Sequence, residues 1–157
     1  MKDEIAWELK KFEELTVFEL YQILRLRSEV FVVEQNCVFL DQDDRDQASF
    51  HLQGKVGGKL IAYVRILPPG LAYEEPSIGR VVSSPAYRRK GAGIELMKTA
   101  IQATRSLWDK SPIMIGAQLY LKEFYENLGF KKCSEIYLED EIDHIKMINY
   151  YENQHAD

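Results

Sequence analysis

The chain has 157 residues, a length typical of one domain and short for two. Hydrophobic residues make up 46% and charged residues 29%, which fits a globular protein and is too apolar for a disordered one. The 20 Lys and Arg against 25 Asp and Glu give a formal net charge of −5, which argues against nucleic acid as a partner. We therefore expect a single globular domain over residues 1–157.

The cysteines and the first residues indicate the compartment. Cys37 and Cys133 are too few and too far apart for a disulfide framework or a zinc site, so we expect no metal. The first 15 residues mix charges of both signs and lack the apolar core of a signal peptide. No apolar run approaches the roughly 18 residues that cross a bilayer. These features predict a cytoplasmic protein that does not bind membranes.

The first elements in chain order are a strand over residues 5–9 and a helix over 16–33. Thr16 and Glu19 have the spacing of a capping box at the start of this helix. Its expected inner face holds residues at helical spacing, namely Leu20, Ile23, Leu24, Arg27 and Phe31. A polar, acidic connection over 36–48 follows.

Three strands come next, over residues 50–54, 60–67 and 77–83. The pair Gly57-Gly58 predicts a hairpin between the first two. Residues 68–70, Pro-Pro-Gly, end the second strand abruptly.

A second long helix is expected over 91–108, with its apolar face at Ile94, Met97, Ile101, Thr104 and Trp108. A strand over 113–117 and a helix over 120–128 follow, and Gly129 suits the left-handed end of that helix. Strands over 130–138 and 144–151 close the chain around an acidic turn. This order predicts an α/β protein with a mixed sheet and helices on its faces.

Residues 88–93, Arg-Arg-Lys-Gly-Ala-Gly, lie between a predicted strand and a predicted helix. A helix N-terminus has unpaired N–H groups and partial positive charge, and glycines let a ligand approach the backbone closely. The segment therefore fits a pyrophosphate. It matches neither the nucleoside-triphosphate loop, which needs Gly-Lys-Ser/Thr, nor the three-glycine dinucleotide fingerprint.

Residues 81–93 resemble the acetyl-coenzyme A motif of the GCN5-related N-acetyltransferase (GNAT) family. Residues 124–130, Phe-Tyr-Glu-Asn-Leu-Gly-Phe, resemble the family's second signature. Residues 31–35 and 143–147 further resemble the ElaA-type branch. The resemblance implies the GNAT fold, which has a mixed, mostly antiparallel central sheet with helices on both faces, and acetyl-CoA as cosubstrate.

The resemblance also implies which residues hold acetyl-CoA. The pantetheine arm would pair with the backbone of three residues, Val81, Val82 and Ser83. The pyrophosphate would lie on the backbone of six more, Arg88, Arg89, Lys90, Gly91, Ala92 and Gly93, with Ile94 in the first helical turn. Gln118 stands where the family often has an asparagine.

Tyr125 matches the family tyrosine that protonates the departing thiolate. A phenol has a reference pKa of about 10 and a thiol one of about 8.5, so a tyrosine can give its proton to a thiolate. The alternative role for Tyr125 is a half-buried aromatic on an amphipathic helix.

An amine must lose a proton before it attacks a thioester, so a base is needed. The candidates are Glu34, His144 and His51, and each could instead be an ordinary polar residue. Arg80, in the strand that faces the ligand, would pair with Glu34 or another carboxylate, or contact the substrate. The N–H of Val82 or Ser83 would stabilise the oxyanion.

The acidic residues 41–46 begin like a calcium loop but lack its glycine and closing glutamate. They are either a solvated loop or a negative rim that attracts a cationic amine, together with the acidic residues in 135–143.

Two functions remain open from the sequence. The first is an N-acetyltransferase that transfers acetyl directly to a primary amine of a small molecule or peptide, in a ternary complex. The second is a non-catalytic module that binds acyl-CoA or another protein. Dimers are common in the family, and the sequence does not decide whether this chain forms a homodimer.

Overall fold

The computed structural model describes residues 4–88 and 91–151. Its strands are β1 (Ala6–Lys11), β2 (Phe50–Val56), β3 (Lys59–Leu67), β4 (Ser77–Ser83), β5 (Ile113–Gln118), β6 (Lys131–Lys132), β7 (Tyr137–Glu139) and β8 (Ile142–Asn149). Its helices are α1 (Val17–Arg27), η2 (Ser28–Glu34), α2 (Ala92–Trp108) and α3 (Lys122–Glu126). Four single turns complete the list, η1 (Phe12–Glu14), η3 (Asp46–Ala48), η4 (Pro85–Tyr87) and η5 (Leu119–Leu121).

The first helix begins as predicted and ends differently. The Glu19 N–H donates to the Thr16 hydroxyl at 3.1 Å, and the Glu19 carboxylate accepts from the Thr16 N–H at 2.9 Å. This capping box satisfies two N–H groups that a bare helix start would leave unpaired. After Arg27 the chain continues as a π-helix, η2, up to Glu34. The sequence predicted one α-helix over this whole segment.

Two other predictions need correction. Ile94 was expected on the inner face of α2, but it is 48% exposed, whereas Met97 and Thr104 are buried as expected. The single strand expected over residues 130–138 is two short strands, β6 and β7, which both pair with β8. Residues 133–136 leave the sheet between them.

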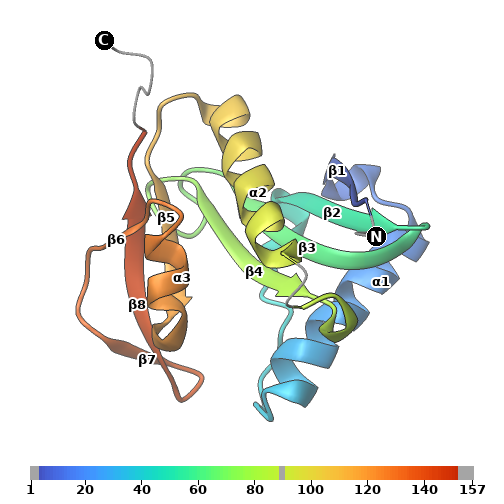
Figure 1. Cartoon of the computed structure of the whole chain (residues 1–157), viewed down its shortest axis with the longest axis horizontal. Helices are drawn as coiled ribbons and strands as arrows, with labels where there is room; N and C mark the ends of the chain where they lie inside the picture. Colours follow the sequence, from blue (N-terminus) through green and yellow to red (C-terminus); the bar gives the residue numbers. More distant parts are fainter. Residues whose placement is uncertain (1–3, 89–90, 152–157) are drawn as a thin grey trace.

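The eight strands of the described residues form one sheet in the order β1-β2-β3-β4-β5-β8-β6, with β7 also paired to β8. Every pairing is antiparallel except that of β4 with β5. Within the described residues, β4 and β5 are in register only at Ser77 and Met114. The two strands then run apart, as Figure 1 shows. The middle of the sheet is therefore open toward the end of β4.

Helices cover both faces of the sheet, as predicted (Figure 1). On β3, Val64 and Ile66 belong to the main core cluster, which also contains the buried face of α2. Tyr63, which precedes Val64 and faces the other way, packs with Ile23 and Leu26 of α1. The alternation of side chains along β3 thus divides the core between the two helices.

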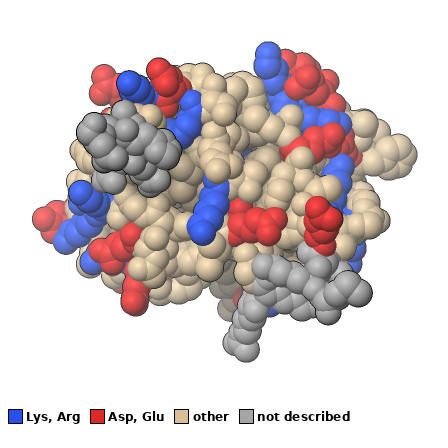
Figure 2. Space-filling model, turned by 45° about the horizontal axis from the view of Figure 1, so that its top comes forward, with Lys and Arg blue, Asp and Glu red and all other residues tan. Residues whose placement is uncertain are grey.

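The surface carries charges of both signs. Figure 2 shows basic and acidic side chains interspersed over the visible face, with no continuous basic stripe on it. Among the residues that the structure describes, no helix has the length and apolar character needed to span a bilayer.

Candidate active site

A cavity of about 450 Å3 lies where β4 and β5 separate. Residues 78–83 of β4 form one wall and residues 115–118 of β5 form the wall opposite. Residues of η2, α3 and the β7–β8 hairpin line the remaining sides. Segments that are far apart in the sequence therefore line one cavity.

The end of β4 exposes backbone to this cavity. The Ser84 N–H donates to the Ile61 carbonyl at 2.7 Å, and Val82 is paired with Tyr63, so both backbones face β3. Successive backbone groups of a strand point to opposite edges. The N–H and C=O of Ser83 consequently face the edge that β5 has left, where a ligand can pair with them. Of the two N–H groups expected to stabilise an oxyanion, that of Ser83 therefore faces the cavity and that of Val82 faces β3.

The α2 N-terminus lies at one end of the cavity. Gly91 has a left-handed backbone, with φ of +81°, a conformation that costs glycine little. Gly93 lines the cavity, and a Cβ built on it meets no atom within 4 Å, so its surroundings are open. Ala92 is buried, whereas Ile94 is exposed. A 17-residue helix that begins with such a turn fits an anionic phosphate group.

Arg88 lines the same cavity and is held by Glu34. Its guanidinium donates to both carboxylate oxygens of Glu34, at 2.6 and 2.8 Å. These hydrogen bonds hold the pKa of Glu34 below its usual value. Arg89 and Lys90, predicted to bind the pyrophosphate, lie outside the described residues.

Tyr125 lies on α3 and also lines the cavity, although it is only 6% exposed. The edge-on rings of Phe124 and Phe130 pack against it. Burial raises the pKa of Tyr125 to about 12, so its phenol keeps its proton at neutral pH.

Gln118, on the wall formed by β5, donates from Nε2 to Oε1 of Gln35 at 3.3 Å.

His144 reaches the cavity from β8, directly across from Gln118. Its Nδ1 lies 2.7 Å from the carbonyl oxygen of Ile142, which can only accept, so Nδ1 carries a proton. In the neutral ring Nε2 is therefore the basic nitrogen. The Tyr137 ring stacks on the imidazole, and a Glu139 carboxylate oxygen lies 3.4 Å from Nε2.

His51 does not belong to this cavity. Its Nδ1 lies 2.7 Å from the Tyr63 hydroxyl and its Nε2 lies 2.9 Å from the Asp46 carbonyl oxygen. It is fully buried on the α1 side of the sheet, and burial lowers its pKa. His51 is thus a core histidine with both nitrogens engaged, and the expectation that it could serve as the base was wrong.

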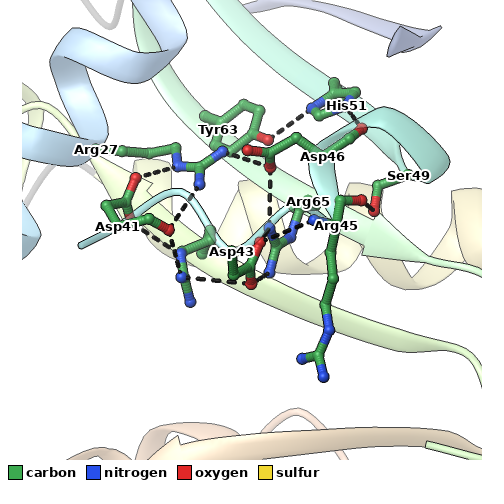
Figure 3. A network of polar contacts seen from close by, with 10 residues as sticks. Arg27, Asp41, Asp43, Arg45, Asp46, Ser49, His51, Tyr63 and Arg65 are labelled. Atoms are coloured by element: carbon green, nitrogen blue, oxygen red, sulfur yellow. Dashed lines mark hydrogen bonds and ion pairs between the residues drawn. The ribbon is translucent and has the colours of Figure 1, made fainter. Parts of the chain in front are cut away.

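The acidic residues 41–46 were expected to form a solvated loop or a negative rim, but three of them form ion pairs with arginines. Asp41 and Asp46 are buried, and both accept hydrogen bonds from Arg27 of α1, as Figure 3 shows. Asp46 also accepts from Arg65, and Asp43 binds the same guanidinium through both of its oxygens. Asp41, Asp43 and Asp46 therefore form an ion-pair network with Arg27 and Arg65 and are not a free negative rim, whereas Asp44 is exposed.

Arg80 pairs with this network and not with Glu34. Its Nε donates to the Asp41 carboxylate at 2.9 Å, and its Nη2 donates to the Asp41 carbonyl at 2.7 Å. Arg80 also lines the cavity. Of the two partners considered from the sequence, another carboxylate is therefore the one observed.

Three residues of the cavity were not named as site residues from the sequence: Gln35 appeared only within the branch motif 31–35, Asp140 only among the acidic residues in 135–143, and Phe39 had no signal. Gln35 and Phe39 line it from the segment after η2, and Asp140 lines it from the β7–β8 turn. The Cys37 thiol donates to the Asp140 carbonyl at 3.5 Å and joins these two segments. Only tertiary structure brings them together. Over residues 4–88 and 91–151, no three His, Cys, Asp or Glu side chains are grouped so as to hold a metal ion.

Comparison with known proteins gives a consistent result. The sequence profile of the family described as acetyltransferase (GNAT) domain matches residues 30–150. Protein ElaA of Escherichia coli is 40% identical over 91% of this chain and 95% of its own length. A UPF0039 protein of Synechocystis is 40% identical over 92% of this chain and 95% of its own.

Solved structures agree in fold. The crystal structure of an acyl-CoA N-acyltransferase from Pseudomonas aeruginosa aligns with a TM-score of 0.89 at 42% identity, covering 93% of this chain and 99% of that one. The crystal structure of Escherichia coli ElaA aligns with a TM-score of 0.87 at 38% identity and the same coverage. With the matched profile, the relatives and the cavity between diverging β4 and β5, the chain belongs to the GNAT acetyltransferase family and to its ElaA-type branch.

Proposed function

We propose that this protein is an acetyl-CoA-dependent N-acetyltransferase that transfers acetyl directly to a primary amine of a small molecule or peptide. The observation that carries the proposal is the cavity itself. It places the open edge of β4, the start of α2, the Tyr125 phenol and the His144 imidazole around one space. Both reactants and both proton-transfer groups can meet there.

The residues around the cavity fit acetyl-CoA. The backbone of residues 81–83 would pair with the pantetheine amides, and the α2 N-terminus from Gly91 to Gly93 would hold the pyrophosphate. The open space beside Gly93 supports this assignment. When bound, acetyl-CoA supplies an activated acetyl thioester.

The chain's own groups then handle charge and protons. His144 Nε2 accepts the proton that the amine must lose, because Nδ1 is committed to the Ile142 carbonyl. The Ser83 N–H stabilises negative charge on the carbonyl oxygen under attack. Tyr125 gives its proton to the thiolate that departs, and its phenolate regains a proton from the acetylated nitrogen, which must lose its second proton to become a neutral amide. Free coenzyme A thiol and an N-acetyl amine are the products.

His144 is favoured over Glu34 as the base. Both oxygens of Glu34 are engaged by Arg88, which lowers the pKa of Glu34 and weakens it as a base. We assign Glu34 to orienting Arg88 at the cofactor end of the cavity. A direct transfer needs no covalent enzyme intermediate. Consistent with this, neither Cys37 nor Cys133 forms a hydrogen bond with a histidine of the described residues.

Titration with acetyl-CoA tests whether the protein binds this cosubstrate. A ligand that binds only the folded protein raises its Tm, by an amount that grows with ligand concentration. A clear rise at millimolar acetyl-CoA supports the assignment, and no shift contradicts it. Replacing Gly91 with valine, which does not tolerate a positive φ, should abolish the rise.

We further propose that the whole chain is one domain and acts in the cytoplasm. The sequence leaves a homodimer open, and light scattering after size exclusion distinguishes a monomer of 18.3 kDa from a dimer of twice that mass.

A further inference from the structure

The backbone of β4 is irregular next to the proposed cofactor site. Tyr63 of β3 pairs with Val82, but Arg65 pairs with Gly79, so Arg80 and Val81 together oppose Val64 alone. This extra residue is a β-bulge. Arg80 has a φ of +49°, a left-handed conformation that a residue with a Cβ disfavours.

A strained residue of this kind persists only when its surroundings hold it in place. The side chain of Arg80 is fixed at two points by Asp41, through the carboxylate at 2.9 Å and the carbonyl at 2.7 Å. A more distant contact, of 3.5 Å, joins Arg80 to Asp43. Asp41 is thus the main anchor of the bulge.

Asp41 is itself anchored. Its second carboxylate oxygen accepts from Arg27 Nε at 2.8 Å, and the side chains of Asp41 and Arg27 are 2% and 0% exposed. Arg27 belongs to the helix that packs on the opposite side of β3 from α2. A rigid path therefore leads from α1 through Asp41 to the backbone of β4.

We propose that Asp41 is a positioning residue for acetyl transfer, because it holds Arg80 in the left-handed bulge that aims the following backbone of β4 into the cavity. This inference rests on the proposed function. Without the bulge, the strand after Arg80 would shift by one residue, and the edge of residues 81–83 would turn away from the cavity.

Asp46 provides a matched control. It is buried like Asp41 and accepts from Arg27 at 2.8 Å, but its other partner is Arg65 at 2.9 Å. Among the contacts of the described residues, none joins Asp46 to Arg80. Asp41→Asn and Asp46→Asn therefore weaken the same network, and only the first releases the bulge.

The first measurement is the Kd for acetyl-CoA of both variants by calorimetry, with the Tm of each. We expect a comparable fall in Tm for both. The Kd should rise about tenfold for Asp41→Asn, the effect of one misaligned backbone hydrogen bond, and less than about twofold for Asp46→Asn.

A second pair of variants leaves Asp41 unchanged, so its result is informative even if Asp41→Asn does not fold. Arg80→Ala and Arg80→Gly remove the same guanidinium, but only glycine adopts a positive φ without strain. Arg80→Ala should bind acetyl-CoA about tenfold more weakly than Arg80→Gly. Equal Kd values for these two variants would overturn the role of Asp41. A wild-type protein that does not bind acetyl-CoA would instead contradict the proposed function.

Discussion

The Nδ1 atom of His144 lies 2.7 Å from the carbonyl oxygen of Ile142, and this contact fixes the proton of the neutral imidazole on Nδ1. The basic nitrogen is then Nε2. This arrangement is a property of the β7–β8 hairpin, because both residues lie on β8 and the ring is further held by stacking on Tyr137.

Replacing His144 by glutamine should lower kcat about 100-fold, the usual contribution of a general base, and leave the Kd for acetyl-CoA within about twofold. Glu34→Gln should lower kcat by less than tenfold, because an exposed ion pair such as Glu34–Arg88 contributes little. Steady-state kinetics at saturating amine measure both. The reverse order of effects would assign the base to Glu34.

Tyr125→Phe should lower kcat about 10- to 100-fold without weakening acetyl-CoA binding, because only the proton donor is lost. Since burial raises the pKa of Tyr125 to about 12, the phenol stays protonated, and wild-type turnover should not fall between about pH 8 and 10. Tyr120→Phe, an exposed neighbour at the cavity, is the control and should lose less. Wild-type kcat in Tyr125→Phe at every pH would remove Tyr125 from the mechanism.

Acid should destabilise the fold in two stages. Burial lowers the pKa of His51, so the unfolded chain binds a proton below about pH 6.5 that the folded protein does not, and stability falls with pH from there. Burial alone would raise the pKa of Asp46, but Arg27 and Arg65 hold it below its usual value. Its contribution is present above the unfolded pKa of about 3.9 and is lost below it.

Urea unfolding at several pH values between 7.5 and 3.5 measures this dependence. His51→Gln should flatten the part between about pH 6.5 and 5 and leave the steeper part near pH 4 in place. A stability that stays constant over the whole range would refute both assignments.

Arg27→Met should destabilise the protein by about 3–5 kcal/mol, because Asp41 and Asp46 would each lose a buried partner. Arg25→Met, at an exposed position of the same helix, should change stability by less than about 0.5 kcal/mol. Denaturant unfolding of the two variants compares them directly. Equal small effects would mean that the network adds little to stability.

The sequence predicted features whose causes are local. The capping box at Thr16 and Glu19, the hairpin at Gly57-Gly58 and the glycine start of α2 each depend on neighbouring residues, and all three are observed. The two family motifs predicted the fold through their resemblance to the GNAT family, and residues of both motifs line the cavity.

Features with distant causes were not predictable. Asp41 lies 14 residues from Arg27 and 39 from Arg80, so its three-way contact follows only from the folded chain. The same holds for the bulge at Arg80, which depends on a side chain from another segment. His144 and Glu34 could be named as candidates, but the partners that distinguish them, Ile142 and Arg88, are set by tertiary structure.

Release of coenzyme A thiol from acetyl-CoA by the wild-type protein would test its N-acetyltransferase activity directly. The assay would use a panel of polyamines, aminoglycosides, amino acids and lysine peptides, with His144→Gln as the matched control. We expect thiol release and an N-acetylated product with one class of amine, and a loss of about 100-fold in the variant. Binding of acetyl-CoA with no amine-dependent release across the panel would contradict this activity and would favour a non-catalytic acyl-CoA-binding module.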